Sequence, residues 1–254
     1  MTAVITRLDG HVLQLRMNRP EKRNALTLPM YDAMSEALEQ AETGRGVRAI
    51  VILGSSGSFC AGSDLADFPS DPSQHGPTPV MRLVEALVHA SVPIVAAVDG
   101  VAAGFGSTML LHLDSVVASP ATRIFFSFVN MALVPEAGSS LLLTRQLGYT
   151  RAAELLLRAA PIDGVEAHRL GIVSTLAEPA NVESTALSIA AEFASKPPQA
   201  MRRAKKLLKG DTAELMQRIR EEERDVFLGL KSAEGAEALR AFRERRAPDF
   251  SGTS

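Results

Sequence analysis

The sequence predicts a mixed α/β core that is followed by a helical lobe, and three observations support this fold class. Short β-rich runs alternate with amphipathic helical patterns through the first half of the chain, as in α/β proteins. From about residue 135 onward, almost every segment has a helical pattern. The 254 residues, 46% of them hydrophobic, are enough to bury a sizeable core. We therefore expect a core over residues 1–195 and a helical lobe over residues 196–254.

The strands and first helices of the core are predicted from apolar periodicity. Residues 50–53 and 94–98 are almost continuously apolar, which is typical of strands that are covered on both faces. The predicted strands span residues 11–16, 48–54, 92–98, 114–119 and 123–127. Two helices, over residues 28–41 and 80–90, would place their apolar side chains on one face.

The rest of the chain is predicted to be helical, with glycines ending several helices. The expected helices span residues 136–147, 150–158, 164–170, 181–195, 198–208, 212–229 and 233–245. Gly148, Gly171 and Gly210 follow three of these patterns, where glycine commonly stops a helix. Residues 67–79 are rich in Pro, Ser and Asp, and we expect them to form a mobile loop.

Charge and cysteine content exclude several classes of protein. The formal net charge is −2, so no overall basic field points to nucleic acid or to an anionic membrane. The single cysteine, Cys60, excludes an internal disulfide framework and is most simply a small buried residue. The five histidines lack metal-ligand spacing, so no metal site is expected. Without a targeting pattern or an apolar run of about 18 residues, the sequence indicates a cytoplasmic protein.

Three glycine-containing loops are the candidates for chemistry. Residues 58–65 follow the strand over 48–54, and residues 99–106 follow the strand over 92–98 and lead into a helix expected over 107–113. Ligands of α/β sheets collect outside the carboxyl ends of strands, so these loops can bring two backbone N–H groups to one point. Together with a helix N-terminus they would form an oxyanion hole. Taken singly, either loop is explained equally well by glycines needed for tight turns.

The third loop, VPEAGSS at residues 134–140, contains a glutamate with two interpretations. Pro135 suits the first position of a helix, and a carboxylate in the first turn is stabilised by the helix dipole. On this interpretation Glu136 simply begins the helix over 136–147. On the other interpretation, Glu136 is the carboxylate that faces an active site.

Six segments in order carry a resemblance to a known family. They read LRMNRPEKRNALTLPMYDAM, FCAGSDL, DGVAAGFGSTMLLHLD, LVPEAGSSLLLTRQLG, SKPPQAMRRAKKLL and AEGAEALRAFRERRAPDF. With these segments the chain resembles the crotonase (enoyl-CoA hydratase/isomerase) superfamily over nearly its whole length. The resemblance implies a crotonase-like spiral of ββα units, a C-terminal helical trimerisation lobe and the binding of acyl-CoA thioesters.

The resemblance also implies the residues of the site. It assigns the two N–H groups of the oxyanion hole to Ser63 and Phe105. It places the contacts to CoA among Lys22, Arg23, Ala25, Ala61, Gly62, Asp64, Leu65 and Gly104. Lys22 and Arg23 are explained about as well by a solvated loop. Phe105 stands where many members have Gly or Ala, so its ring either narrows the pocket or turns away from it.

The acid/base residues that the resemblance implies favour an isomerase. Hydratases of the family use two glutamates, and the corresponding positions here are Thr108 and Phe128. Glu136 stands at the position of the single carboxylate of the Δ3,Δ2-enoyl-CoA isomerases. One carboxylate in an apolar pocket can take a proton from C2 and return it to C4 while N–H groups hold the enolate oxygen.

Several alternatives stay open at this stage. The chain could catalyse enoyl-CoA hydration through another group, hydrolyse a thioester, or be a non-catalytic CoA-binding or RNA-binding pseudoenzyme. Asp64 is more simply a helix cap, and it is the second choice for the acid. The basic segment 201–209 is followed by acidic residues at 214 and 221–223, which favours a mixed solvated surface over an RNA site. We expect no nucleic acid, no membrane, no cofactor beyond the coenzyme A of the substrate, and a homotrimer or dimer of trimers.

Overall fold

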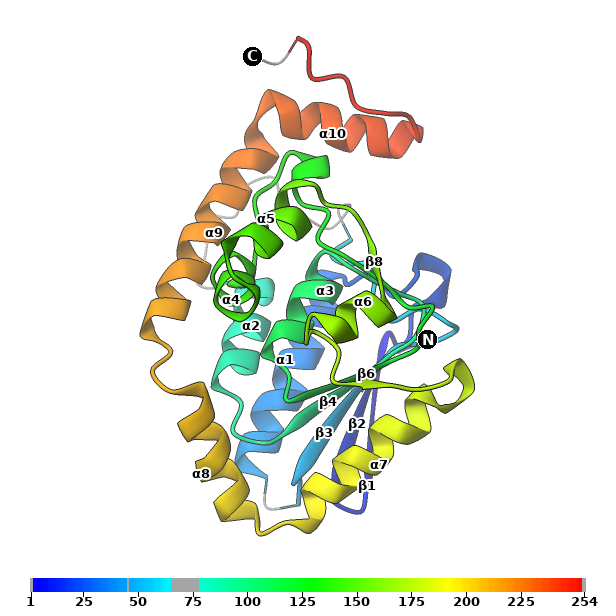
Figure 1. Ribbon diagram of the computed structural model, residues 1–254, viewed down its shortest axis with the longest axis vertical. Helices are drawn as coiled ribbons and strands as arrows, with labels where there is room; N and C mark the ends of the chain where they lie inside the picture. Colours follow the sequence, from blue (N-terminus) through cyan, green and yellow to red (C-terminus); the bar gives the residue numbers. More distant parts are fainter. Residues whose placement is uncertain (1, 45, 65–77, 253–254) are drawn as a thin grey trace.

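The computed structural model describes residues 2–44, 46–64 and 78–252, and its main sheet has six strands. The strand order is β1-β2-β3-β4-β6-β9 (Figure 1). The strands are β1 (Val4–Asp9), β2 (Val12–Met17), β3 (Ala49–Leu53), β4 (Ile94–Val98), β6 (Ser115–Ala118) and β9 (Thr175–Leu176). β1 is antiparallel to β2, whereas every other neighbouring pair is parallel.

Helices cover both faces of this sheet, because successive side chains of a strand point to opposite faces. Ile50 and Ile52 of β3 pack into the cluster that includes α1 (Leu28–Thr43) and α2 (Pro79–His89). Val51 packs into a second cluster with α7 (Val182–Ser195), on the other side (Figure 1). The continuous apolar runs of the sequence therefore do mark strands buried on both faces.

A smaller sheet follows the first one, and the two together form a spiral. Its strands are β5 (Val101–Ala103), β7 (Arg123–Phe125) and β8 (Ile162–Asp163). Isolated bridges between Cys60 and Ala102, and between Leu26 and Ser63, extend this row of pairings. Each long strand is thus followed by a short extended segment and a helix, as in β4, β5 and α3 (Phe105–Thr108). This repetition is the spiral of ββα units that the resemblance implies.

The second half of the chain is mainly helical, as predicted. Its helices are α4 (Ser139–Leu147), α5 (Tyr149–Leu157), α6 (Gly164–Arg169), α7, α8 (Pro198–Lys209), α9 (Ala213–Lys231) and α10 (Ala233–Glu244). α8 and α9 run along one side of the molecule, and α10 lies at its end (Figure 1). Among the described residues, no helix is both long and apolar enough to cross a bilayer.

Buried polar contacts attach α8 to the core. The Lys205 side chain is only 4% exposed, and its Nζ donates hydrogen bonds to Asp114 Oδ2 at 2.5 Å and to the Val92 carbonyl oxygen at 2.8 Å. The expectation of a solvated basic surface over 201–209 is therefore wrong for Lys205. The boundary expected at residue 195 stays a prediction.

Two helix boundaries differ from the predicted ones because of the backbone between elements. The helix expected from residue 107 begins at Phe105 and continues as a 3₁₀ helix over Met109–His112. α4 begins at Ser139 rather than at residue 136, because Ala137 and Gly138 have φ values of 55° and 76°, outside the right-handed helical region. Glu136 is therefore not a helix starter, and the plain interpretation of VPEAGSS is wrong.

One further segment differs from the sequence prediction, and another lies mostly outside the described residues. Residues 4–9, for which no strand was predicted, form the edge strand β1, in which only Val4 is buried. The predicted loop over 67–79 lies outside the described residues except at its end. There Thr78 caps α2, and Pro79 is already the first helical residue.

Candidate active site

The two loops that follow β3 and β4 meet at a pair of glycines. Gly62 has a φ of 94°, and a Cβ placed on it would lie 2.9 Å from the Ala103 carbonyl oxygen and 3.6 Å from Gly104 Cα. A side chain at Gly62 would therefore separate the loops. The residues that follow the two glycines, Ser63 and Phe105, lie on adjacent turns as expected. Neither of their N–H groups has a hydrogen-bond acceptor within the described part of the chain.

Tyr31 of α1 contacts both of these turns. Its hydroxyl group lies 2.7 Å from Ser63 Oγ, and its ring meets the Phe105 ring edge-on with the centroids 4.9 Å apart. Burial, followed by the charge of Glu136, raises the pKa of Tyr31 well above its usual value. A neutral, buried tyrosine therefore braces the two loops, and the sequence prediction missed it.

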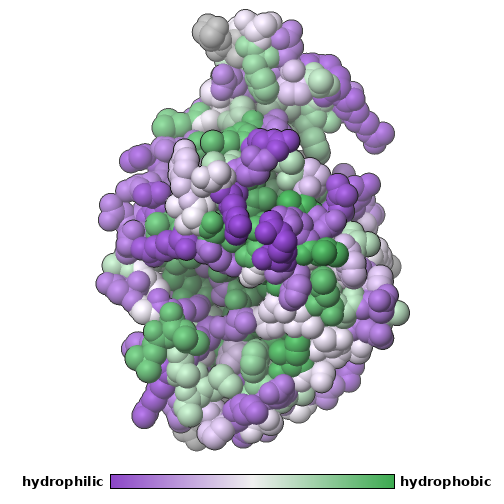
Figure 2. Space-filling model, in the orientation of Figure 1, coloured by the Kyte–Doolittle hydropathy of each residue, from purple (hydrophilic) through white to green (hydrophobic). Residues whose placement is uncertain are grey.

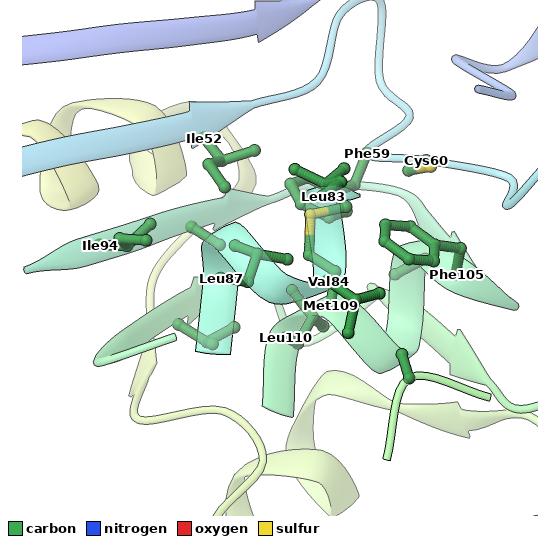
Figure 3. Close-up of a cluster of buried hydrophobic side chains, with 14 of the residues drawn as sticks. Ile52, Phe59, Cys60, Leu83, Val84, Leu87, Ile94, Phe105, Met109 and Leu110 are labelled. Atoms are coloured by element: carbon green, nitrogen blue, oxygen red, sulfur yellow. The ribbon is translucent and has the colours of Figure 1, made fainter. Parts of the chain in front are cut away.

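The Phe105 ring points into the core. It is 1% exposed, and Figure 3 shows it directed toward a cluster that includes Val84 and Met109. The ring does not appear among the residues that line the pocket beside Glu136. Of the two orientations considered from the sequence, the ring thus adopts the one that turns away and leaves its N–H free.

Glu136 lines a mainly apolar pocket between α2 and α9. The pocket occupies about 620 Å³ including its mouth, and its apolar walls come from Leu28, Pro79, Val80, Met81, Val84, Ala137, Ile219, Val226 and Phe227. Burial, and secondarily the charge of Glu222, raises the pKa of Glu136 to about 8. The charge of Glu136 in turn raises the pKa values of Tyr31 and Cys60, so Glu136 lies within electrostatic range of the two loops.

Two buried side chains hold the loop that carries Glu136. Burial lowers the pKa of His112 to about 4, so its ring is neutral at ordinary pH and Nε2–H donates to the Ala137 carbonyl oxygen at 2.8 Å. Glu222 of α9 accepts from the Gly138 N–H at 2.6 Å and from the Ser140 N–H at 3.1 Å. The carboxylate of Glu222 thereby satisfies N–H groups at the start of α4. The two contacts fix the backbone on the C-terminal side of Glu136.

Four acidic residues, at 214 and 221–223, are expected on a solvated surface, and this is wrong for Glu222 and Glu223. Glu222 is 5% exposed, and Glu223 is half-buried at the wall of the pocket. A signal was present in the sequence, because Glu223 stands in helical phase with Ile219 and Val226, at i+4 and i+7 of the apolar stripe. Thr78, which also lines the pocket, lies next to the undescribed residues and was not singled out.

The segments expected to contact CoA lie side by side. The Ala61 N–H donates to the Arg23 carbonyl oxygen at 3.0 Å, and the Leu26 N–H donates to the Gly62 carbonyl oxygen at 2.8 Å. Ala25 and Ala61 are half-buried between the two segments. Lys22 and Arg23 are exposed, so the structure brings their backbone to the site and leaves their side chains at the surface.

Asp64 and Leu65 complete the account of the predicted residues. Arg19 Nη1 donates to Asp64 Oδ2 at 2.6 Å, and both side chains are about one-fifth exposed, at 20% and 18%. This ion pair makes Asp64 a structural residue rather than an acid that faces the pocket. The helical turn that Asp64 was expected to cap, and Leu65 itself, lie outside the described residues.

The remaining candidates for chemistry are buried. Thr108 is fully buried, with its hydroxyl donating to the Phe105 carbonyl oxygen at 3.3 Å, and Phe128 is 6% exposed. Neither is an acid, so the two positions that the resemblance implies for the hydratase glutamates contain no acid/base group. Burial raises the pKa of the Cys60 thiol to about 12, which confirms that it is an inert buried residue.

Comparison with known proteins decides the family. The model of the enoyl-CoA hydratase/isomerase family matches residues 7–253, almost the whole chain. The chain belongs to this family. The resemblance to the crotonase superfamily is thereby confirmed, and the protein is an enzyme of a family that acts on acyl-CoA thioesters.

Relatives within the family differ in the reaction they are named for. The chain is 30% identical over 262 residues to the 1,2-epoxyphenylacetyl-CoA isomerase of Escherichia coli, with 99% of each protein covered. It is also 30% identical over 251 residues to enoyl-CoA hydratase EchA19 of Mycobacterium tuberculosis, covering 95% of this chain and 93% of that protein. An isomerase and a hydratase are thus about equally similar, and identity alone does not select the reaction.

Solved structures of the family share this fold. An enoyl-CoA hydratase/isomerase from Pseudoalteromonas atlantica is 37% identical with a TM-score of 0.92, covering 98% of this chain and 100% of that chain. OdaA from Pseudomonas aeruginosa is 38% identical with a TM-score of 0.91, covering 95% of this chain and 99% of that one. The crotonase-like α/β fold with a C-terminal helical region is therefore confirmed.

Proposed function

We propose that this enzyme moves the double bond of a 3-enoyl-CoA thioester to the 2-position. The observation that carries the proposal is Glu136, a carboxylate with a pKa raised to about 8 in an apolar pocket, within electrostatic range of Tyr31 and Cys60 at the Ser63 and Phe105 turns. Thr108 and Phe128 supply no second acid at the positions that hydratases use. A relative named an isomerase, at 30% identity, supports the same class of reaction.

The proposed reaction needs one acid/base group and one site for negative charge. The Glu136 carboxylate takes a proton from C2, and the electrons of the C2–H bond shift toward the thioester oxygen to give an enolate. The N–H groups of Ser63 and Phe105 hold this oxygen, and each such donor contributes about 3–4 kcal/mol to transition-state stability in comparable sites. The protonated Glu136 then delivers the same proton to C4, which leaves the double bond between C2 and C3.

The surroundings of Glu136 suit this proton transfer. A carboxylate in water is a weak base, with a pKa near 4. Burial raises the pKa of Glu136 to about 8, which brings it nearer to a working pH and makes the group a stronger base. The contacts of Ala137 and Gly138 with His112 and Glu222 would keep the carboxylate between C2 and C4.

The remaining contacts of the substrate are also proposals. The paired segments around Ala25 and Ala61, with Gly62, Asp64, Leu65 and Gly104 nearby, would bind CoA mainly through main-chain groups. Lys22 and Arg23 are exposed and would reach the CoA phosphates. The substrate carries the CoA, so no separate cofactor is proposed.

A homotrimer or a dimer of trimers is proposed for the assembly. Leu228 of α9 and Phe242 of α10 are 63% and 62% exposed, respectively. Large apolar side chains on neighbouring helices are typical of surfaces that another subunit covers. Figure 2 shows pale-green, hydrophobic patches among purple, hydrophilic ones at the end of the molecule where α10 lies.

The test is turnover against a panel of enoyl-CoA positional isomers. Double-bond migration is followed together with the release of 3-hydroxyacyl-CoA and of free CoA. The proposal expects 3-enoyl-CoA to become 2-enoyl-CoA without water addition. Formation of mainly 3-hydroxyacyl-CoA, or of free CoA, would establish hydration or thioester hydrolysis instead, and tight binding without turnover would indicate a pseudoenzyme.

A further inference from the structure

The pocket beside Glu136 contains a second carboxylate that the proposed proton transfer does not use. Glu223 of α9 lines the same pocket as Glu136, and its side chain is half-buried. The other described residues of the lining are Thr78, Glu136 and apolar side chains. A pocket for an acyl chain needs no carboxylate for apolar contact, so Glu223 requires its own explanation.

Thr78 fixes how Glu223 is presented. As the N-cap of α2, the Thr78 hydroxyl oxygen accepts a hydrogen bond from the Met81 N–H at 3.1 Å. The hydroxyl has a single proton, and it donates that proton to Glu223 Oε1 at 2.9 Å. Oε1 is therefore occupied, whereas Oε2 has no hydrogen-bond partner within the described part of the chain. Oε2 is an acceptor that a bound molecule can use.

The charged side chains in the described lining of the pocket have the same sign. Glu136 and Glu223 line the pocket, the charge of Glu222 acts on Glu136 from outside the lining, and no described residue of the lining is basic. Burial raises the pKa of Glu223, the charge of Glu85 acts in the same direction, and the hydrogen bond from Thr78 opposes the shift. An anionic group that enters this pocket would meet like charges in a poorly solvated space, without a cation to neutralise it.

We propose that Glu223, oriented by Thr78, is a specificity-determining residue that excludes acyl groups ending in a carboxylate and favours neutral acyl groups with a hydrogen-bond donor at their far end. The inference rests on the proposed function in one respect, that the acyl group occupies the pocket beside Glu136. It goes beyond that function because it defines the chemistry of the distal end of the substrate. A hydroxyl group at that end would donate to Oε2, whereas a methyl group would leave Oε2 unpaired.

The test measures the binding of unreactive thioesters, so that it does not depend on which reaction the enzyme catalyses. Saturated acyl-CoA compounds of matched length, ending in methyl, hydroxyl or carboxylate, are titrated calorimetrically at about pH 8 over a series of chain lengths. The wild-type enzyme is expected to bind the carboxylate-ended compound about 10–100-fold more weakly than the methyl-ended one. The hydroxyl-ended compound is expected to bind about 3–10-fold more tightly than it does to the Glu223→Leu variant.

Three variants separate the charge of Glu223 from its position. Glu223→Gln should reduce the discrimination against carboxylate by at least about tenfold, because it removes the charge. Thr78→Val should weaken the hydroxyl preference, whereas Thr78→Ser keeps both hydrogen bonds and should bind like the wild type. Glu221→Gln is the matched control, since Glu221 is on the same helix but pairs with Arg218.

The outcomes of these titrations distinguish the two proposals. Equal affinities for methyl-ended and carboxylate-ended compounds in the wild type, or discrimination that Glu223→Gln leaves unchanged, would overturn the role of Glu223. Discrimination that depends on Glu223, in an enzyme that shows no double-bond migration, would overturn the proposed isomerase and leave the specificity proposal in place.

Discussion

At the residue scale, the apolar environment of Glu136 determines both its strength as a base and its effect on stability. Its environment disfavours the charged form, so the side chain is a strong base only because the fold holds it in an apolar pocket. The same environment penalises the folded state whenever Glu136 is ionised. The residue should therefore affect activity and stability in opposite directions.

Replacing Glu136 with Gln tests this opposition. Glu136→Gln removes the only group proposed to move the proton, so the rate of double-bond migration should fall by about 10²–10⁴-fold. Binding of a saturated acyl-CoA should change little, as measured by calorimetry. Glu214→Gln, at an exposed position on α9, is the control. Retention of full turnover by Glu136→Gln would exclude Glu136 as the acid/base.

The pH dependence of stability follows from the raised pKa of Glu136. The pKa in the folded state is about 8 and lies above the ordinary value of 4.5 for a glutamate side chain, so the native state binds the proton more tightly than the unfolded chain. The contribution to stability is complete below about pH 4.5 and is lost as the pH rises toward 8. At pH 9 the Glu136→Gln variant should therefore be more stable than the wild type, by roughly 2–5 kcal/mol. Denaturant unfolding at about pH 5 and pH 9 checks this, and an identical difference at both values would contradict it.

The rate should show the opposite dependence on pH. The carboxylate form of Glu136 takes the proton of C2, so kcat/KM should rise with pH. It should level off above about pH 8, which is the pKa of Glu136 in the enzyme without substrate. The measurement is a kcat/KM profile with a 3-enoyl-CoA substrate. A profile that is flat between about pH 6 and pH 9 would show that the base has a different pKa or that another step limits the rate.

At the scale of elements, the site depends on α9 as much as on the loops that follow the strands. Glu222 of α9 is 84 positions away from Gly138 in sequence, yet its carboxylate accepts that residue's N–H group. This contact satisfies the N-terminus of α4 and places a like charge near Glu136. α9 thereby helps to position the proposed base, and the charge of Glu222 adds to the effect of burial on the pKa of Glu136.

Substitution of Glu222 separates these two effects. Glu222→Gln replaces a carboxylate, which only accepts hydrogen bonds, with an amide whose NH₂ group cannot accept one from Gly138 or Ser140. The free energy of unfolding should therefore fall by about 1–3 kcal/mol. Removal of the negative charge should lower the pKa of Glu136, so the rise of kcat/KM should move to lower pH. Chemical denaturation and the pH profile measure the two effects, with Glu221→Gln as the control. An unchanged stability together with an unchanged profile would refute the role of Glu222.

At the scale of the whole molecule, the exposed apolar side chains of α9 and α10 favour assembly. Leu228 and Phe242 would lose their contact with water in an oligomer, which is favourable for apolar surface. α10 extends to the end of the molecule, away from the main sheet (Figure 1). The exposed apolar side chains of these helices, Leu228 and Phe242, would therefore contact other subunits rather than their own core.

The assembly is testable by molar mass. Light scattering should give a mass near three or six times 27.1 kDa for the wild type. Phe242→Asp should shift the protein toward smaller species, because it places a charge in the proposed interface. Leu208→Asp is the control, because Leu208 is 88% exposed on α8, near the opposite end of the molecule from α10. A monomeric wild-type protein would refute the trimer.

The sequence by itself determined the fold class, the family, most of the helices and the strands β2, β3, β4, β6 and β7. The apolar run at residues 50–53 reflects burial on both faces of a strand. The glycines at positions 62 and 104 reflect the close approach of two backbones. Such requirements depend on neighbouring residues and on residue type, so they can be read from the chain. Glu136 was found in the same way, from its place in a motif.

Only the tertiary structure decided how that motif is held and what faces it. The burial of Glu222 and the opening of Glu223 into the pocket depend on how α9 packs against loops that are far away in sequence. The direction of the Phe105 ring depends on its packing against Tyr31 of α1. The local sequence does not distinguish a glutamate on an exposed helix from one whose carboxylate caps α4. The difference between them lies in which distant N–H groups come within hydrogen-bond reach, and that is a property of the packed molecule.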